Sequence, residues 1–593
     1  GNHWTPVSLL AADLSDDRPA DSAGKLRSNY ATLNPLDDQP GAAATLTLGN
    51  LHGAGSTTAN TAVGSTIAFS SGKFIAISRP SAVNSGEGDL FVVNRDFVFS
   101  TSGMGSHVNA WGEYLESSTL MTISHDGSTD ASNAFGGSVT WEAGVDYLLC
   151  AVDADNNKMW QGMHDVSTDT TYWWDDAGDD WTGNPADGGT TGVTIDAPPY
   201  RFMLGYYNTR NSDVDFGQGS FWDTITLPSG YKTLFTQNLT EPTITTPSNY
   251  FQTALTPHDG SSATVTCKWD MDVYDTMIIS KSRASVSDWW FSDGLDGETK
   301  VMDTTSAGTT ATDANIHSVS GATLTLGSTF ANENYTTFLI QCGASASPTN
   351  ISAGSIDTGV PSLASVASVA SHGGSAVITY TGAGSGNSTV GHGMSGAPEF
   401  YIIWTLGGGN SYRVGHKDFV ATKNLLFDDN GALRDEATWD NSTLPNASGQ
   451  NIISLGTEGD VNGSYAFKIW AFKRVSGLIG IGSYTGNGAA DGPSIIVDDG
   501  GSGFRPAFLL IKCSSHAGSW LVYNTAVQPY NDNWRYLKPD DGAAERGSSD
   551  EAIDVLSNGF KCRSLNSSSN SSGRTYIYLA FAEIPFALNT RAR

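Results

Sequence analysis

Residues 465–473 read YAFKIWAFK and residues 575–583 read TYIYLAFAE, two apolar and aromatic runs of β-strand length. A third run, YTTFLIQC at 335–342, has the same character. Runs of this length that are rich in Ile, Phe, Tyr and Trp and bounded by turn residues are typical of strands. The three runs indicate that the second half of the chain is built from one repeated β unit.

The segments that precede these runs share one order of landmarks. Each contains an earlier apolar strand and then an aromatic residue, a Lys and an acidic turn. The earlier strands are DTMIIS at 275–280, EFYIIW at 399–404 and AFLLIK at 507–512, and the aromatic residues are Trp289, Tyr412 and Trp520. Equivalent landmarks of the last two copies are separated by a nearly constant number of residues. The shared order of landmarks aligns Ile279 of the first copy with Ile403 and Ile511. Internal repetition on this scale predicts tandem units, each large enough for its own β-sandwich.

The composition is that of an all-β protein. Among 593 residues, 67 Gly and 21 Pro supply turns, and a charged fraction of 16% argues against long exposed helices. The formal net charge is −30. A surface of this sign repels phosphate backbones and anionic lipids, so nucleic-acid partners are excluded. No apolar run approaches the ~20 residues that membrane insertion requires.

These patterns predict an all-β chain of several tandem β-sandwich domains. The predicted parts are an irregular lead-in at 1–40, a β-sandwich at 41–238, and three β repeats at 239–358, 359–475 and 476–593. Ser-, Ala- and Gly-rich spacers, such as GVPSLASVASVASHGG at 359–374, are expected to separate the repeats. Within the first sandwich, the stretch from Asp155 to Lys158 predicts a hairpin turn between two apolar runs.

The same turn is the weak candidate for a metal site. Asp153 and Asp155 offer oxygen ligands at alternating positions, as calcium loops do. The turn lacks the glycine and the closing Glu of an EF-hand, so an ordinary turn is the main interpretation and a structural Ca²⁺ the alternative; no other cofactor is expected. The odd number of cysteines and the absence of CxxC spacing argue against a disulfide framework. We expect buried core residues at Cys150, Cys267, Cys342, Cys513 and Cys562.

The most unusual stretch is WWDDAGDDW at 173–181, with three Trp and four Asp in nine residues. Exposed Trp rings beside carboxylates can hold sugars, because ring faces take CH groups and acids accept hydroxyl hydrogen bonds. The stretch lies in the longest connection without a strand pattern, 165–196, and such long loops are usually functional or disordered. The predicted binding surface therefore consists of Tyr172, Trp173, Trp174, Asp175, Asp176, Asp179, Asp180 and Trp181. The alternatives are a packed loop with solvated Asp residues, or Trp rings that form a subunit interface.

Signatures of catalysis are weak. The sequence contains no HExxH, P-loop or GxSxG motif. GHGMSG at 391–396 places a His beside a Ser, but no partner Asp can be identified. Paired carboxylates of 173–181 could hydrolyse glycosidic bonds if they lay roughly 5–10 Å apart in a groove. The chain is therefore predicted not to be an enzyme, with a glycoside hydrolase as the alternative.

Several segments resemble a family of tailed-phage virion proteins. They are GNHWTP (1–6), SNYATLNPL (28–36), SSGKFIAIS (70–78), VDADNNKMW (152–160), DVDFGQGSFWDTITLPSGYKTL (213–234), and the final repeat with YTGNG, GFRPAFLLIK and YIYLAFAE. The family comprises tail-fibre or tailspike-like proteins in which a SPRY-type, concanavalin-like (jelly-roll) β-sandwich precedes fibre-protein repeats. Two departures matter. A further amino-terminal region usually precedes GNHWTP, so a fragment or shorter relative is expected, and MWQGMHDV stands where SPRY-like sandwiches often read W…GKNG.

The resemblance implies a structural protein of the virion, in the tail rather than the head. Its expected role is attachment to a host-surface glycan, as a tail fibre or spike. Its expected partners are other virion proteins and further copies of itself in a homotrimer, in which effective concentration multiplies weak sugar sites. The alternatives are a polysaccharide-degrading tailspike, a capsid-decorating or architectural fibre without a receptor, and a secreted bacterial adhesin.

Overall fold

The structure, a computed structural model, describes residues 30–588 apart from 39–42, 56–60, 82–87, 96, 98, 100–106, 118–119, 127, 135–140, 177–179, 207–209, 296–299, 304–310, 313–315, 353–361, 407–410, 421, 437 and 440–450. It divides into unit 1, Gly1–Glu241 with Phe586–Arg593, and unit 2, Pro242–Pro585. Strands account for 47% and helices for 4% of it, which confirms the predicted all-β class with several sandwiches. The described helices are α1 (Gly459–Asn462) and the 3-10 turns η3 (Ser220–Asp223), η4 (Thr236–Asn238), η5 (Pro247–Asn249), η6 (Ser549–Glu551) and η7 (Phe586–Leu588).

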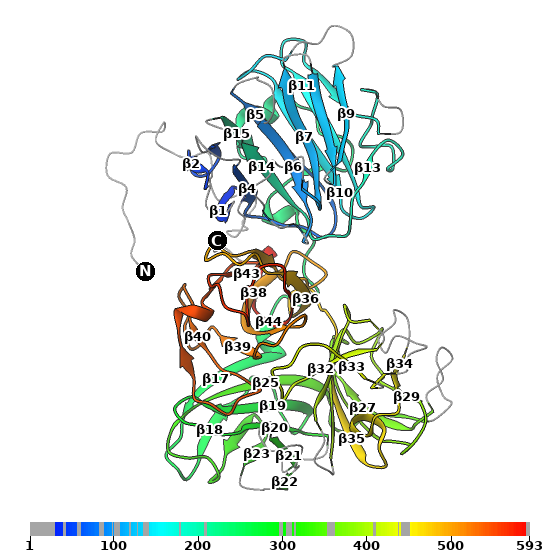
Figure 1. Cartoon of the computed structure of the whole chain (residues 1–593), viewed down its shortest axis with the longest axis vertical. Coiled ribbons are helices and arrows are strands. Elements are labelled where there is room, and N and C mark those ends of the chain that lie inside the picture. Colours follow the sequence, from blue (N-terminus) through cyan, green and yellow to red (C-terminus); the bar gives the residue numbers. More distant parts are fainter. Residues whose placement is uncertain are drawn as a thin grey trace. The chain divides into compact units, whose positions relative to one another are not determined.

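Unit 1 is a β-sandwich of two sheets (Figure 1). The first sheet has the order β1-β4-β14-β6-β7-β8-β9, with bounds Leu33–Asp38, Thr61–Ser65, Arg201–Tyr206, Gly88–Val93, Ala110–Ser117, Leu120–His125 and Ser128–Ala134. The second has the order β12-β11-β10-β5-β15-β3-β2, with bounds Thr170–Trp173, Lys158–Asp165, Tyr147–Asp153, Lys73–Pro80, Asn211–Asp215, His52–Ala54 and Thr45–Thr47. Two short strands pair with interior strands of this sheet, β13 (Val193–Thr194) with β11 and β16 (Lys232–Thr233) with β5.

The middle of the second sheet of unit 1 is buried on both faces. Along β10, Leu148 and Cys150 point into the core between the two sheets, whereas Leu149 and Ala151 lie in another core on the outer face. This alternation follows from the two-residue period of a strand. Residues 219–231 cover the outer core, which explains why β10 reads as a continuous apolar run rather than an alternating one.

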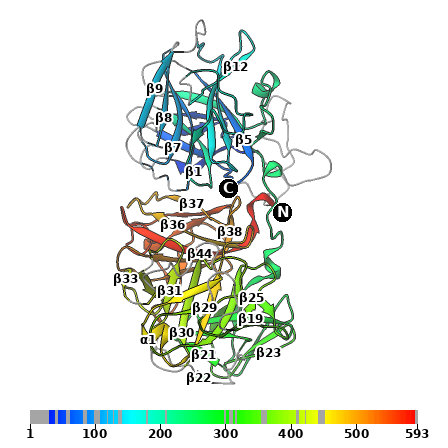
Figure 2. The ribbon, with the colours of Figure 1, turned by 90° about the vertical axis from the view of Figure 1, so that its right-hand side faces the viewer.

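Unit 2 contains three copies of one sheet, in the order opening strand, closing strand, apolar strand, fourth strand. Figure 2 labels β25 and β19 of the first copy, β30 and β31 of the second, and β36, β44 and β38 of the third. The copies are β17-β25-β19-β20, β28-β35-β30-β31 and β36-β44-β38-β39. Their bounds, in that order, are Phe251–Pro257, Asn334–Ala344, Tyr274–Ser282 and Trp289–Asp293; Ser375–Thr381, Ala466–Phe472, Phe400–Thr405 and Arg413–His416; and Ile479–Thr485, Thr575–Pro585, Phe504–Cys513 and Leu521–Asn524. The apolar runs predicted to repeat therefore form equivalent, paired strands.

A small second sheet completes each sandwich. The three small sheets are β18-β24-β23 (Ala263–Thr266, Thr323–Leu326, His317–Ser320), β29-β34 (Ser388–Gly391, Ile452–Leu455) and β37-β43-β42 (Ser494–Ile496, Gly559–Cys562, Ile553–Val555). The remaining strands are β21 (Lys300–Asp303), β22 (Ala311–Thr312), β26 (Thr349–Ile351), β27 (Ser365–Val369), β32 (Lys423–Leu426), β33 (Arg434–Asp435), β40 (Arg535–Tyr536) and β41 (Arg546–Gly547). We call β17–β25 copy 1, β26–β35 copy 2 and β36–β44 copy 3.

The segment 359–374, expected to be a spacer, is part of a sheet. Its strand β27 pairs with β26 on one side and with β28 on the other. Ala367 and Ser368 are each 1% exposed. The small side chains here reflect close packing against neighbouring strands, so the prediction of a separating spacer was wrong for residues 365–369.

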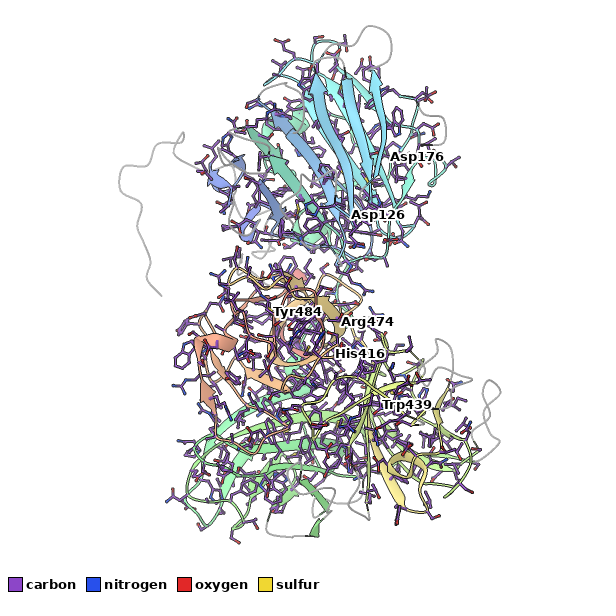
Figure 3. All side chains as sticks on the ribbon, viewed as in Figure 1. Asp126, Asp176, His416, Trp439, Arg474 and Tyr484 are labelled. Carbon is purple, nitrogen blue, oxygen red and sulfur yellow. The ribbon has the colours of Figure 1, made fainter. Side chains whose placement is uncertain are left out.

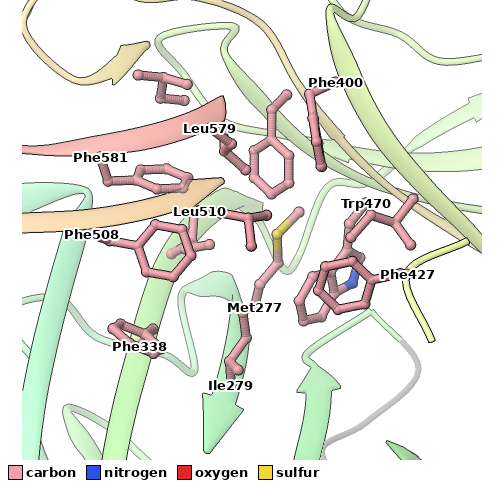
Figure 4. Close-up of a cluster of buried hydrophobic side chains, with 14 of the residues drawn as sticks. Met277, Ile279, Phe338, Phe400, Phe427, Trp470, Phe508, Leu510, Leu579 and Phe581 are labelled. Carbon is pink, nitrogen blue, oxygen red and sulfur yellow. The ribbon is translucent and has the colours of Figure 1, made fainter. Parts of the chain in front are cut away.

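The three main sheets share one apolar core (Figure 4). The core residues shown there include Met277, Ile279 and Phe338 of copy 1, Phe400 and Trp470 of copy 2, and Phe508, Leu510 and Phe581 of copy 3. The aromatic landmarks Trp289, Tyr412 and Trp520 all lie in this core and are at most 1% exposed.

The shared core also corrects the alignment of the first copy. Ile279 points into it together with Ile402 and Leu510, whereas Ile403 points into a separate core inside copy 2. The predicted match of Ile279 with Ile403 is therefore one residue out. A shift of one residue moves a side chain to the opposite face of a strand, so it changes the core that the residue joins.

The YTG motifs at 380–382 and 484–486, at the ends of β28 and β36, each lie beside a buried Asn. Asn462 Nδ2 donates to the carbonyl oxygen of Gly456 at 3.0 Å, and its Oδ1 accepts the N–H of Ala383 at 2.9 Å. In copy 3, Asn570 Oδ1 accepts the N–H of Asn487 at 3.0 Å. Equivalent bonds in two copies show that these glycine-rich motifs are structural, because they satisfy buried polar groups.

Candidate functional site

A row of polar and aromatic side chains crosses the outer face of the second sheet of unit 1. The strand register pairs Asp213 of β15 with Arg79 of β5 and with His52 of β3. On the other side of β5, Tyr147 of β10 is paired with His164 of β11. Paired residues of neighbouring strands point to the same face, so the register places these five side chains together.

Phe221 of η3 joins the row by stacking. The guanidinium of Arg79 lies 4.6 Å from the centre of the Phe221 ring, and this ring stacks on Tyr147 with centroids 4.8 Å apart. Tyr147 in turn stacks on His164 at 5.9 Å. The result is a ladder of four planar groups, in which each contact contributes on the order of 0.5–1.5 kcal/mol.

Trp222 follows Phe221, and we call Tyr147, Phe221 and Trp222 the aromatic patch. The indole Nε1 of Trp222 donates to Asp215 Oδ1 at 2.9 Å, and the same oxygen accepts the N–H of Gly217 at 2.8 Å. These bonds hold the turn over the sheet. All three rings of the patch are half-buried, and none of the aromatic rings that the structure describes stacks on Trp222.

Charged groups border the aromatic patch. Arg79 Nη2 lies 2.6 Å from Asp213 Oδ2, and His52 Nδ1 lies 2.7 Å from Asp213 Oδ1. Burial alone would raise the pKa of Asp213, but hydrogen bonds from Arg79 and His52 outweigh it and hold that pKa below its ordinary value. The side chains of His52, Arg79 and Asp213 are 25%, 33% and 26% exposed, so a ligand can reach them from solvent.

The other titratable groups of this region respond to burial. Burial lowers the pKa of His164, although Asp169 and Asp146 oppose the shift. Burial also raises the pKa of the Tyr147 hydroxyl and of Asp215. The imidazole of His164 is therefore neutral at pH 7, and Tyr147 stays a hydrogen-bond donor. Half-exposed rings beside an ionised carboxylate and a guanidinium suit recognition of a polar ligand with apolar faces.

The tryptophans of the predicted loop are mostly buried. Trp173 is 9% exposed and belongs to the outer core, whereas Trp174 is 4% exposed and belongs to the core between the sheets. Trp181 packs edge-on against Trp174 with ring centroids 5.5 Å apart, and Tyr172 is half-buried. Trp173 ends β12 and Trp174 follows it; neighbouring residues of an extended chain point to opposite faces, and both faces here are cores. Trp173 and Trp174 are therefore core residues rather than an exposed stacking surface.

The carboxylates of the same loop lie nearer to solvent. Asp176 (Figure 3) and Asp180 are exposed, and Asp175 is half-buried. The backbone of Asp175 pairs with that of Asp180, and Asp180 Oδ1 accepts the N–H of Thr182 at 2.9 Å. Asp179 lies outside the described residues. Ligand binding by this loop stays a prediction that rests on its exposed acids.

The candidate calcium ligands Asp153 and Asp155 make contacts that stabilise a β-hairpin. The turn joins β10 to β11 where it was predicted, with Asp153 opposite Lys158. Asp153 Oδ2 lies 2.7 Å from Lys73 Nζ, and Asp155 Oδ1 accepts the N–H of Gly72 at 2.9 Å. Within the described part of the chain, no three His, Cys, Asp or Glu side chains gather closely enough to hold a metal ion. All five cysteines are buried and free, as expected of core residues.

Sequence reasoning missed the aromatic patch and the charged groups beside it. The signal lay in DVDFGQGSFWD at 213–223, where Asp213 and Asp215 alternate on one strand and a Phe-Trp pair follows two glycines. Tyr147, Arg79 and His52 carry no such signal, because only the strand register brings them next to Asp213.

Comparison with known proteins identifies a family for unit 2. Residues 246–585 match the family described as "Domain of unknown function (DUF7483)". No curated protein sequence matches the chain. No helix among the described residues is both long and apolar enough to cross a membrane.

Two solved structures of SPRY domains are similar to part of the chain. The crystal structure of the TRIM65 PSpry domain is 11% identical and covers 31% of this chain and 90% of its own, with a TM-score of 0.22. The SPRY domain of human HERC1 is 10% identical and covers 31% of this chain and 96% of its own, also with a TM-score of 0.22. At this TM-score the likeness decides nothing about function, and the two-sheet sandwich of unit 1 rests on its own strand pairing.

Proposed function

The chain belongs to the family described as "Domain of unknown function (DUF7483)", and we propose that it is a phage virion protein, a tail fibre or spike, whose unit 1 recognises a host-surface glycan. The segments that resemble tail-fibre proteins support the virion context. The aromatic patch supports the glycan-binding role, and the half-buried indole of Trp222 is the observation that carries it.

A sugar needs an apolar surface for its CH face and polar groups for its hydroxyls. Trp222 offers an indole that its bond to Asp215 fixes in place. Asp213 supplies acceptor oxygens and Arg79 supplies donors, and their mutual ion pair holds both in position before a ligand arrives. Such preorganisation lowers the entropic cost of binding.

In this proposal unit 2 is the rigid structural part and unit 1 the recognition part. The 593-residue chain carries a net charge of −30, which favours solubility and disfavours strongly anionic glycans. We therefore expect a neutral or weakly charged glycan on the host surface.

The test is binding of the full chain to a printed array of bacterial surface glycans. Trp222→Ala and Asp213→Asn should each weaken binding at least tenfold, because they remove the stacking ring or one ionised acceptor. Val108→Ala changes an exposed residue just before β7 of the first sheet, and this variant should bind like the wild type. Melting curves must first show that each variant is folded.

Unchanged binding by both patch variants would place the glycan site elsewhere, with the exposed acids of 175–180 as the next candidates. No binding to any glycan would favour an architectural fibre. Release of new reducing ends from a bound polysaccharide would favour the degrading tailspike instead.

A further inference from the structure

The three copies of unit 2 contact one another through repeated, directional bonds. The landmark Trp520 of copy 3 donates from Nε1 to the carbonyl oxygen of Leu426 in copy 2 at 2.9 Å. The landmark Trp289 of copy 1 donates in the same way to the carbonyl oxygen of Lys538 in copy 3 at 3.0 Å. Both landmark tryptophans therefore reach from their own copy into another, from copy 1 to copy 3 and from copy 3 to copy 2.

A buried ion pair joins copy 2 to copy 1. Lys468 Nζ of copy 2 lies 2.8 Å from Asp293 Oδ1 of copy 1, and both side chains are at most 2% exposed. Trp470 Nε1 donates to the other oxygen of Asp293 at 2.9 Å. The carboxylate is thus fully engaged across the junction, as a buried ion pair requires.

Copies 2 and 3 meet through two more basic residues. Lys512 Nζ donates to the carbonyl oxygens of Asn430 and Gly431 at 3.0 and 2.7 Å. Arg474 (Figure 3), in the connection between the copies, bonds to Glu399 of copy 2 at 2.8 Å and to Asp498 of copy 3.

The junction of copies 1 and 3 is not imposed by chain connectivity. Arg283 and Glu545 are 262 positions apart, yet their side chains form two hydrogen bonds, Nε to Oε2 at 2.6 Å and Nη2 to Oε1 at 3.1 Å. Their backbones also pair, since Glu545 N–H donates to the carbonyl oxygen of Arg283 at 3.0 Å. Phe251 of copy 1 stacks on Phe581 of copy 3 with centroids 4.6 Å apart. Copy 3 therefore contacts copy 1 directly, although the two are far apart in the sequence.

We propose that copies 1, 2 and 3 form a closed ring within one chain, and that the face joining copy 1 to copy 3 is an interaction surface whose partner is this same chain. A head-to-tail contact either closes into a ring or propagates into an open array. In an open array of repeats, each copy would be stabilised only by its neighbours. In the closed ring the shared core couples all three copies, and no junction face is left for a second chain.

The ring has a consequence for the predicted homotrimer. Within residues 242–585, one chain supplies three sandwiches around one core, so a trimer is not needed to bury their apolar faces. If the closing junction opens, the freed faces of copies 1 and 3 are complementary, and a second copy of the chain can occupy them.

Hydrogen exchange of the full chain, followed by mass spectrometry, tests the ring. Arg283→Glu places two carboxylates in contact at the closing junction. Exchange should then rise at least tenfold in all three copies, including the strands β28 and β35 of copy 2. The matched control is Arg546→Glu, which breaks an ion pair with Asp541 inside copy 3, where both side chains are more than 40% exposed. The control should exchange like the wild type.

A second variant and a second measurement test the closed ring independently. Trp289→Phe keeps a buried ring but removes the bond to Lys538, and it should raise exchange in all copies even if Arg283→Glu fails to fold. Light scattering should show concentration-dependent multimers for Arg283→Glu and none for the control. Faster exchange confined to copies 1 and 3, or an unchanged mass of the Arg283→Glu chain at all concentrations, would overturn the closed ring.

Discussion

At the scale of single residues, the burial of Glu551 makes the stability of the fold depend on pH. It lies in η6, is 2% exposed, and accepts a hydrogen bond from Ser569 Oγ at 2.8 Å. Burial raises its pKa from 4.5 to about 7. Between these two values the folded state keeps a proton that the unfolded state has lost, so stability falls as pH rises through this window and stays lower above it.

The prediction is that Glu551→Gln flattens this pH dependence. Relative to the wild type, the variant should gain up to ~3 kcal/mol in unfolding free energy between pH 4.5 and pH 8, because it carries no proton to lose. Urea unfolding at the two pH values measures the difference. Asp550→Asn removes an exposed neighbouring charge that adds to the raised pKa of Glu551, so this comparison variant should keep the wild-type direction of the slope with a smaller size. A wild-type slope retained by Glu551→Gln would show that Glu551 is not the responsible group.

At the scale of elements, β27 provides the sharpest contrast between composition and structure. It lies inside its sheet, with ladder partners on both sides at Ala367. Ala367→Pro removes a ladder N–H from this strand and should lower the unfolding free energy by at least ~2 kcal/mol. Ser371→Pro tests the alternative, since Ser371 is exposed in a turn closed by the Gly373 N–H and should tolerate proline. Equal stability of the two variants would mean that 365–369 is a linker after all.

Strands were predictable from the sequence, whereas their faces were only partly so. Runs such as 400–404 indicate a strand by their apolar and aromatic residues, but every one of their side chains is buried, so no polar residue marks which face is which. That is why Ile403 was matched to Ile279 in place of Ile402. For the same reason the sequence did not reveal that Trp173 and Trp174 are buried, since the end of β12 has a core on each face.

At the scale of the whole molecule, the sequence predicted three copies but not their common core. A repeat shows that each copy has an apolar face, and it does not show what covers that face. The covering groups are other copies: Trp289 meets Lys538, and Lys468 meets Asp293, across long separations in the chain. The aromatic patch escaped prediction in the same way, since Arg79 and Tyr147 become neighbours only through strand pairing.

The division into two compact units predicts how the chain melts. Each unit has its own cores, and unit 2 keeps its three copies around a shared one, so calorimetry should show two cooperative transitions rather than one or four. Trp222→Ala should lower only the transition of unit 1, because its indole bonds to Asp215 within that unit. At pH 8, Glu551→Gln should raise only the transition of unit 2. Separate melting of copies 1, 2 and 3 would contradict the shared core, since three sandwiches that bury their main sheets against one another cannot lose one without exposing the other two.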